Sequence, residues 1–574
     1  MRNIVDPRQG RLFDPFQGLF SPIAIRILSQ GWQGVFRHVI LELLPVAKLA
    51  DHFHPTLGAP TKELYSMAGL VFLADFHNWT SHEAAEAYMF RTDVQYALNL
   101  EPGAEVSDRS IERYQKLYRE DDAAAGIFGD VTAALTEKLE LDVSRQRLDS
   151  THLFSHMATF GRTKLMAVAI KRFLTQVHRH APEQYAALPE DLRCRYRPAE
   201  SQLFAGAKDA EARQRSRQQA AEDLLLIIDH FADQPAMTAR STYKSLETIF
   251  GQQCEVVEGK VTVRAKTGGN CIQNPSDLDA TYDGHKGPGY QVQITETCRP
   301  ENEVQLITAA LPQTACESDE AALVPMLEQL EEAGRLPADL LVDTSFASDD
   351  NVQAAAERGV ELIGPVPGRA RENDPGALTV DDFAMDERTG VIDACPAGHQ
   401  PLSCTRDEEG GKTKVEMPAE ACGGCPFRSQ CPIVKTREGR FVVEFTDKEH
   451  RLAGRRVEQE TEVFKGRYAV RSGIESTNSG LKNRLDLGRL RVRGRGAVFR
   501  VIHHKLAGWN VLRAAVSTKL RAWVAEWVAR ALTISEFAPS GNALVPSCGS
   551  ESIEITSFGS RGCKTDRRRL SCAA

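Results

Sequence analysis

Short apolar runs alternate with helix-length amphipathic patterns between residues 289 and 366 of this 574-residue chain. The strand-like runs cover 289–295, 304–311, 340–344 and 361–366. The helical patterns between the later runs cover 319–333 and 349–358. A strand that is reached through a helix pairs in parallel with the strand before it. The alternation therefore predicts an α/β layer with parallel pairing at its centre.

Other patterned regions surround this layer. A strand pattern at 145–154 precedes it, and helical patterns fill 20–139, 160–250 and 464–532. A chain of this length is too long for one hydrophobic core, so we expect at least three folding units. No run approaches the length of a membrane span and the first residues are polar, which predicts a cytoplasmic protein without membrane contact.

The formal charge of −8 hides one strongly basic segment. Residues 465–530 contain 15 Lys and Arg against 3 Asp and Glu, a charge of +12 that leaves −20 for the rest of the chain. Arg491 and Arg493 lie in its densest part, among glycines. Such a density suits contact with phosphates more than the reading of bases. The edge of a solvated strand would show the same alternate arginines.

A helical pattern at 107–119 carries Arg109 and Arg113 on one face and apolar residues on another. It could be the recognition helix of a helix-turn-helix unit. An amphipathic bundle helix with a solvated face explains the same pattern equally well.

Two aspartates stand at informative positions of the strands. Asp149 lies in the 145–154 strand, and Asp343 lies near the end of the 340–344 run. Functional side chains converge at strand ends in α/β sheets. A single aspartate there is more often a turn or cap residue, so the pair strengthens the functional interpretation only modestly.

A third acid belongs to a spaced set of four residues. Tyr468, Arg471, Glu475 and Lys482 are three, four and seven residues apart, which predicts that all four project from one side of a helix. Glu475 would hold a metal ion while Arg471 and Lys482 hold a phosphate group. The alternative is an exposed helix with paired charges.

These four residues match every position of the Y-(2)-R-(3)-E-(6)-K signature, and the chain resembles the DDE transposases of bacterial insertion sequences. Residues 147–152 resemble the strand that carries the family's first Asp, and 341–346 resemble the strand of its second. The resemblance extends over about residues 15–515, including a cysteine-rich block.

The resemblance implies an α/β fold: an RNase H-like mixed sheet with helices, interrupted by helical and Cys-rich insertions and preceded by an all-α DNA-binding domain. The expected parts are a helical N-terminal DNA-binding domain at 15–140, a catalytic domain at 141–368 and 463–532 with a helical insertion at about 160–250, a Cys-rich insertion at 369–462, and a disordered tail at 533–574.

The resemblance also implies the chemistry. Asp149, Asp343 and Glu475 are expected to hold two Mg²⁺ ions, for which Mn²⁺ can substitute. The expected partners are the ends of the transposon and target DNA, with two copies of the chain in the DNA complex. Tyr468, Arg471 and Lys482 are expected to contact the DNA. A catalytically inactive DNA-binding derivative and an RNase H-like nuclease that cuts without joining are the alternatives.

Five of the thirteen cysteines fall within residues 395–431. Cys422 and Cys425 form a C-x-x-C knuckle, and Cys395 and Cys431 could complete a tetrahedral structural Zn²⁺ site. Cys404 or His399 could replace one of these ligands. The alternative is a set of unligated thiols.

Two histidine-containing pairs lie near these elements, His285–Lys286 and His503–His504. A lone histidine is more often a hydrogen-bonded structural residue. We therefore place neither pair in the site.

Overall fold

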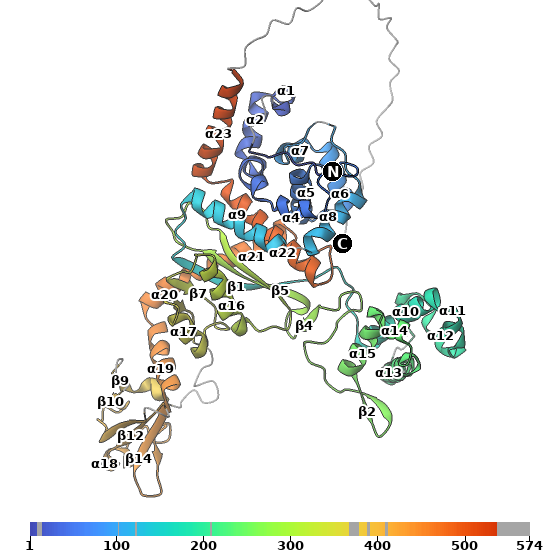
Figure 1. Ribbon diagram of the computed structural model, residues 1–574. Helices are drawn as coiled ribbons and strands as arrows, with labels where there is room; N and C mark the ends of the chain where they lie inside the picture. The colour runs from blue at the N-terminus through green and yellow to red at the C-terminus, as the bar shows by residue number, and fades with distance from the viewer. Residues whose placement is uncertain are drawn as a thin grey trace, which may run out of the picture.

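The computed structural model has a mixed β-sheet at its centre, with helices on both faces and two appendages (Figure 1). It describes residues 1–8, 14–101, 103–120, 123–206, 209–366, 378–386, 391–407 and 411–536. The strands of the sheet are β1 (Arg145–Leu153), β4 (Thr281–Asp283), β5 (Gly287–Thr297), β6 (Ile307–Thr314), β7 (Asp339–Leu341) and β8 (Glu361–Ile363).

The strand order defines the fold. β5 lies between β1 and β6 and is antiparallel to both, while β7 and β8 follow on the other side of β1, parallel to it. β4 pairs with the first residues of β5. Three antiparallel strands continued by two parallel ones, in the order β6–β5–β1–β7–β8, form an RNase H-like sheet. The predicted fold class is confirmed.

Two helices connect the parallel strands and cover one face of the sheet. α16 (Asp319–Glu332) leads from β6 to β7, and α17 (Asp349–Ala356) leads from β7 to β8. The hydroxyls of Ser318 and Ser348 cap them by accepting a backbone hydrogen bond in the first turn. The apolar sides of the helices pack against Leu148 of β1, so this face of the sheet is buried in a hydrophobic core.

The opposite face is covered by helices from both ends of the chain. The N-terminal ones are α1 (Pro15–Leu19), α2 (Pro22–Gln30), α3 (Trp32–Val35), α4 (Val46–Asp51), α5 (Leu64–Phe76), α6 (Ser81–Phe90), α7 (Thr92–Ala97), α8 (Asp108–Glu120) and α9 (Ala123–Leu139), with a π-helical turn at Phe36–Ile40 and a 3₁₀ turn at Leu41–Leu43. The C-terminal ones are α21 (Gly473–Arg484), α22 (Arg495–Ala514) and α23 (Thr518–Glu536).

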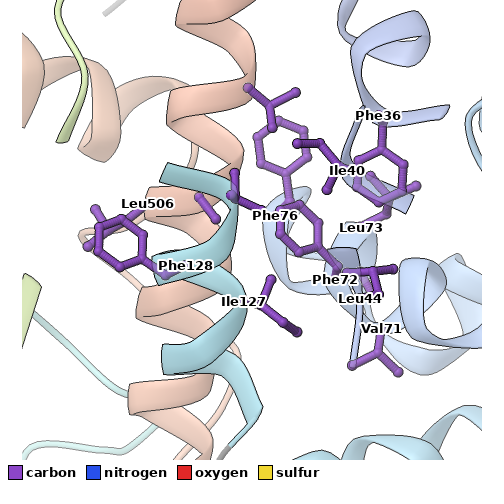
Figure 2. Close-up of a cluster of buried hydrophobic side chains, with 14 of the residues drawn as sticks. Phe36, Ile40, Leu44, Val71, Phe72, Leu73, Phe76, Ile127, Phe128 and Leu506 are labelled. Atoms are coloured by element: carbon purple, nitrogen blue, oxygen red, sulfur yellow. The ribbon is translucent and has the colours of Figure 1, made fainter. Parts of the chain in front are cut away.

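α22 runs through the middle of this layer and is buried along most of its length. Figure 2 shows Leu506 of α22 and Phe128 of α9 in one cluster with Phe72 and Phe76 of α5. Gly508 permits the close approach of α5, because a methyl group at that position would overlap the ring of Phe76.

A buried ion pair joins the same helices. Asp75 of α5 accepts hydrogen bonds from Arg500 of α22 at 2.8 and 3.0 Å, and it lies 2.8 Å from Nδ1 of His504. Burial alone would raise the pKa of Asp75, but Arg500 and His504 outweigh it and the pKa is lowered. Residues 15–140 thus share one core with α22 and do not enclose a separate one.

The helical insertion between β1 and β4 has a hydrophobic core of its own and stands apart from the sheet (Figure 1). Its helices are α10 (Arg162–His180), α11 (Pro182–Ala187), α12 (Glu190–Tyr196), α13 (Ala210–Phe231), α14 (Pro235–Thr238) and α15 (Ser241–Gln253), with a 3₁₀ turn at Glu200–Gln202. A hairpin of β2 (Cys254–Val257) and β3 (Lys260–Val263) follows.

The Cys-rich region forms the second appendage, again with its own small core. It contains a 3₁₀ turn (Val380–Asp382), β9 (Ala384–Met385), β10 (Ile392–Ala394), β11 (Ser403–Asp407), β12 (Lys412–Met417), α18 (Ala419–Gly423), β13 (Val434–Lys435) and β14 (Phe441–Thr446). Four strands pair in the order β11–β12–β14–β13. α19 (Asp447–Gln459) and α20 (Glu462–Tyr468) return the chain to the sheet.

The predicted tail at 533–574 begins inside α23, and its remainder lies outside the described residues. In the part of the chain that the structure describes, no helix is both long and apolar enough to cross a membrane.

Candidate active site

The four signature residues do not lie on one continuous helix. Tyr468 ends α20, Arg471 lies in a 3₁₀ segment (Ala469–Ser472), and only Glu475 and Lys482 belong to α21. The prediction of a single uninterrupted helix was wrong in this respect.

Arg147 of β1 explains the interruption. Its Nη1 donates to the carbonyl of Val470 at 2.9 Å, so this carbonyl has a partner outside the helix. The guanidinium also fills the space beside Gly473, where a methyl group would overlap it. The carbonyl of Val470 thus accepts from a side chain of the sheet as well as from the backbone N–H of Gly473.

A buried carboxylate holds Arg147 in place. Glu296 lies opposite Arg147 in the β1–β5 ladder, and its Oε2 accepts from Nε and Nη2 of Arg147 at 2.8 and 2.5 Å. Its Oε1 accepts from the hydroxyl of Thr477 in α21 at 2.6 Å. Glu296 is almost fully buried. This network ties α21 to the two central strands and fixes the position of the helix that carries Glu475.

The three predicted acids converge on one guanidinium. Nη2 of Arg471 lies 2.9 Å from Oδ1 of Asp149 and 3.7 Å from Oδ2 of Asp343. Nη1 of the same residue lies 3.7 Å from Oε1 of Glu475. The side chain of Arg471 is 14% exposed, and those of Asp149, Asp343 and Glu475 are 14%, 36% and 69% exposed, so the site opens to solvent on the side of Glu475.

Each acid is positioned by its element. Asp149 lies within β1, and its Oδ2 accepts a hydrogen bond from Nδ2 of Asn478 in α21 at 2.9 Å. Asp343 follows β7 by two residues instead of lying within the strand, and the backbone N–H of Ser345 donates to its Oδ1 at 2.8 Å. Glu475 lies in the first turn of α21.

Burial raises the pKa of Asp149, because the charged carboxylate loses hydration. Arg471 acts in the opposite direction, and the nearby carboxylate of Asp343 adds to the increase. Burial also raises the pKa of Tyr468, whose ring stacks on Phe464 with 5.7 Å between the ring centroids. The site therefore concentrates negative charge around a single arginine.

The carboxylate of Asp149 attracts Lys482 of α21. Burial lowers the pKa of Lys482, and the positive charge of Lys286 lowers it further. It forms no ion pair with any residue that the structure describes.

The remaining predicted DNA contacts are spread over the surface. Arg109 and Arg113 are exposed on α8, whose buried side carries Ile111, Tyr114 and Tyr118. Arg493 is exposed, whereas the Nη1 of Arg491 donates to Glu83 of α6 at 2.5 Å. The contact of Arg491 links the glycine-rich segment to the N-terminal helices.

The four predicted zinc ligands line one small cavity in the Cys-rich region. Cys395, Cys422, Cys425 and Cys431 all face it together with His399, whereas Cys404 does not. Burial raises the pKa values of Cys422 and Cys431, and the neighbouring thiols raise them further. Across the described ranges, no group of three or more His, Cys, Asp or Glu side chains is arranged to hold a metal ion, here or at Asp149.

Sequence reasoning missed Arg147, Glu296, Thr477 and Asn478. Asn478 follows Glu475 by three residues, so the helical spacing could have indicated it. Glu296 is the one charged residue of β5, and only the pairing register reveals that it lies opposite Arg147.

A family described as a transposase DDE domain matches residues 394–515. No curated protein matches the chain. A solved structure described as a piggyBac transposase synaptic complex with hairpin DNA is similar with a TM-score of 0.19 and 9% sequence identity, over 67% of this chain and 74% of that one. The matched family domain contains Glu475 and all of α21. The chain thus contains a region similar to a transposase DDE domain, and the sheet brings Asp149 and Asp343, which lie outside that region, to the same guanidinium as Glu475.

Proposed function

We propose that this protein is a transposase of the DDE class that binds the terminal inverted repeats of an insertion sequence and catalyses Mg²⁺-dependent cleavage and transfer of DNA strands. The convergence of three carboxylates from β1, the β7–α17 turn and α21 on Arg471 carries this proposal. Three crowded carboxylates that share a single guanidinium are costly to keep ionised, and a divalent cation would relieve that cost.

The donor set fits magnesium. All three side chains offer carboxylate oxygens, which Mg²⁺ prefers, and no thiol or imidazole is among them. Asp149, Asp343 and Glu475 would hold the ions after small side-chain movements, since Glu475 is largely exposed. Bound Mg²⁺ would neutralise the acids and polarise the phosphate oxygens and the attacking hydroxyl.

Arg471 would change partners when the ions bind. Its guanidinium now neutralises the carboxylates, and it would be free to pair with a phosphate once the metal takes over that role. Asn478 and the Arg147–Glu296 pair would meanwhile keep Asp149 and α21 in place. The chain needs no covalent nucleophile, because water and then a freed 3′-hydroxyl would attack phosphorus in line.

The basic segment supports DNA as the partner. Residues 465–530 carry a charge of +12, and Lys482, Arg493 and Arg495 are among its cations. Phosphate neutralisation by such cations would give salt-dependent binding. The expected homodimer, the cytoplasmic location and the domain boundaries stay predictions.

The test uses a plasmid that carries the DNA flanking the gene on both sides, incubated with the purified protein and Mg²⁺. We expect cuts at both ends of the element, followed by joining of the freed 3′ ends to a target plasmid. The Asp149→Asn variant is the control. Cutting without joining would favour the nuclease alternative, and end binding without any cutting would favour the inactive derivative.

We also propose a structural Zn²⁺ in the Cys-rich region. Four thiols line one cavity there, and the crowding of thiols that raises their pKa values would be relieved by a cation. A closed set of sulfur ligands suits a structural ion and not a catalytic one.

A further inference from the structure

α19 connects the strands of the Cys-rich region to the side of the sheet at which α17 lies (Figure 1). It begins directly after β14, and the backbone N–H of Asp447 in its first turn donates to the carbonyl of Gly411 at 2.9 Å. The carboxylate of Asp447 accepts from Arg406 of β11 at 2.8 Å. The beginning of α19 is therefore fixed to the Cys-rich region.

The same helix contacts the Asp343 turn (residues 342–348), which leads from β7 to α17. Nη1 of Arg455 in α19 donates to the carbonyl of Ala347 in this turn at 3.1 Å, and Nη2 donates to the carbonyl of Gly364, just after β8, at 3.3 Å. Gly364 packs closely against the turn, since a methyl group at this position would overlap its atoms. One guanidinium thus bridges the two backbone segments that follow the parallel strands.

A second arginine of α19 holds the residue that follows the Asp343 turn. Arg451 donates from Nε and Nη2 to the carboxylate of Asp349 at 3.1 and 2.6 Å. Asp349 is only 2% exposed and lies in the first turn of α17. Because a bidentate contact fixes orientation as well as position, Arg451 holds the beginning of α17 at the point where the Asp343 turn ends.

The hydrogen bonds within the Asp343 turn are long. The N–H of Phe346 donates to the carbonyl of Asp343 at 3.3 Å, and the N–H of Ala347 reaches the carbonyl of Thr344 at the same distance. Asn351 of α17 adds a contact to the carbonyl of Phe346 at 2.9 Å. Asp343 itself lies beyond the ladder between β7 and β8. The position of Asp343 therefore depends on the contacts that the turn makes with its surroundings.

We propose that Arg455 and Arg451 are positioning residues for the acid site, through which the Cys-rich region holds Asp343 where a metal ion can bind it. The proposal rests on the proposed function, because Asp343 needs a fixed position only if it binds a metal together with Asp149 and Glu475. Removal of a group that orients a metal-binding carboxylate typically costs about 10- to 100-fold in metal affinity or activity. The Cys-rich region thus contributes to the acid site without supplying a ligand to it.

The experiment compares Arg455→Ala with Arg456→Ala. Arg456 is the next residue of α19, but it pairs with Asp381 within the Cys-rich region. Hydrogen exchange of a peptide that covers residues 342–348, followed by mass spectrometry, reports on the Asp343 turn without metal or DNA. In Arg455→Ala the amides of this peptide should exchange about fivefold faster than in the wild type, because two hydrogen bonds that hold the turn are lost. In Arg456→Ala they should exchange as in the wild type.

The second measurement is the Mg²⁺ dependence of single-turnover DNA cleavage. Arg455→Ala should need about tenfold more Mg²⁺ for half-maximal cleavage, and saturating Mg²⁺ should restore most of the rate. Arg455→Lys keeps one donor group and should lie between Arg455→Ala and the wild type in both measurements. Arg456→Ala should have the Mg²⁺ requirement of the wild type. A merely structural role of Arg455 would lower the rate at every Mg²⁺ concentration without changing the concentration for half-maximal cleavage.

Unchanged exchange of residues 342–348 in Arg455→Ala would overturn the proposal, as would a wild-type Mg²⁺ requirement in this variant. Equal effects of Arg455→Ala and Arg456→Ala would also overturn it, because they would show a general loosening of α19. If Arg455→Ala does not fold, Arg455→Lys decides by the same two measurements. A wild-type protein that does not cut in Mg²⁺ would instead contradict the proposed function, and the exchange data would still decide whether α19 holds the Asp343 turn.

Discussion

The indole ring of Trp509 in α22 occupies the space beside Gly480 of α21 in which any other residue would place its Cβ atom. α21 carries Glu475 and Lys482, and α22 is anchored in the core that the N-terminal helices share. The contact between Gly480 and Trp509 therefore sets the distance between α21 and the buried helix α22 behind it.

Gly480→Ala should destabilise the protein by about 1–3 kcal/mol, because the added methyl group must displace the indole ring. It should also slow cleavage in saturated complexes, since the shift moves Glu475 away from Asp149. Gly454→Ala is the matched control: this glycine lies in α19 with no atom near its missing Cβ. At position 454, the higher helix propensity of alanine over glycine should stabilise the protein by up to about 1 kcal/mol. Chemical denaturation of both variants measures the difference, and equal gains in stability would show that α21 is free to move.

Asp149→Asn, Asp343→Asn and Glu475→Gln should each reduce Mg²⁺-dependent cleavage at least about a hundredfold while DNA binding in Ca²⁺ persists, because each removes one charge that would hold the metal. Asp350→Asn is the control, since this exposed acid of α17 pairs with Lys448 and does not face the site. Single-turnover cleavage of saturated complexes is the measurement. Normal cleavage by any of the three variants would exclude that residue from the site.

Arg471→Ala should shift the acidic limb of the pH profile for cleavage to higher pH. The pKa of Asp149 is raised by burial and held down by Arg471, so loss of the guanidinium raises it further. Protonation of Asp149 would then begin at a higher pH as the solution is acidified, and the active ionised form would be lost earlier. Arg471→Lys keeps a charge and should shift the limb less. Parallel profiles for the wild type and Arg471→Ala, differing only in height, would show that Arg471 does not control the ionisation of the acids.

The stability of the protein should decrease as the pH falls from about 6.5 to 4. Burial lowers the pKa of His77 and His503 to about 4 and that of His38 to about 3, so the folded protein keeps them neutral while the unfolded chain takes up protons below 6.5. Each of these histidines would lower the free energy of unfolding by up to about 1.4 kcal/mol for every pH unit of acidification in this window. The midpoint of urea unfolding should therefore be lower at pH 5.5 than at pH 7.5. His503→Gln should reduce this dependence, and His180→Gln, an exposed position, should not.

Freshly reduced protein should contain about one equivalent of zinc. Cys422→Ser combined with Cys425→Ser should abolish it and lower the thermal stability, because binding of a structural metal contributes to folding. Cys316→Ser, an exposed cysteine far from the cavity in sequence, should leave the zinc content unchanged. Metal analysis of the wild-type protein is decisive: a zinc-free preparation with full stability would show that the cavity holds only thiols.

The sheet could be predicted from the sequence because its strands and connecting helices are regular. The 319–333 and 349–358 patterns became α16 and α17 nearly residue for residue. Asp343 was placed at a strand end, but β7 already stops at Leu341 and the acid lies in a turn. Strand ends depend on pairing partners that a local pattern does not contain.

The basic segment at 465–530 shows why the roles of individual cations could not be predicted from the sequence. Its charge suggested phosphate contacts throughout, yet Arg500 is buried against Asp75, 425 residues away in sequence. Lys505 is fully buried as well, where its Nζ donates to the carbonyl of Leu485 at 2.5 Å and burial lowers its pKa to about 8. Composition does not distinguish between these cations. Only the tertiary structure shows which of them stabilise the fold and which remain accessible to a ligand.

The burial of α22 within the N-terminal helices also governs when this protein can fold during its synthesis. Asp75 leaves the ribosome more than four hundred residues before Arg500. Phe72 and Phe76 therefore remain exposed to solvent until α22 has been synthesised. Apolar surface that stays exposed during synthesis makes a nascent chain prone to aggregation. A product that terminates before α22 would fail to complete even its first helical layer. A chain that ends before residue 514 should therefore not assemble the site formed by Asp149, Asp343 and Glu475.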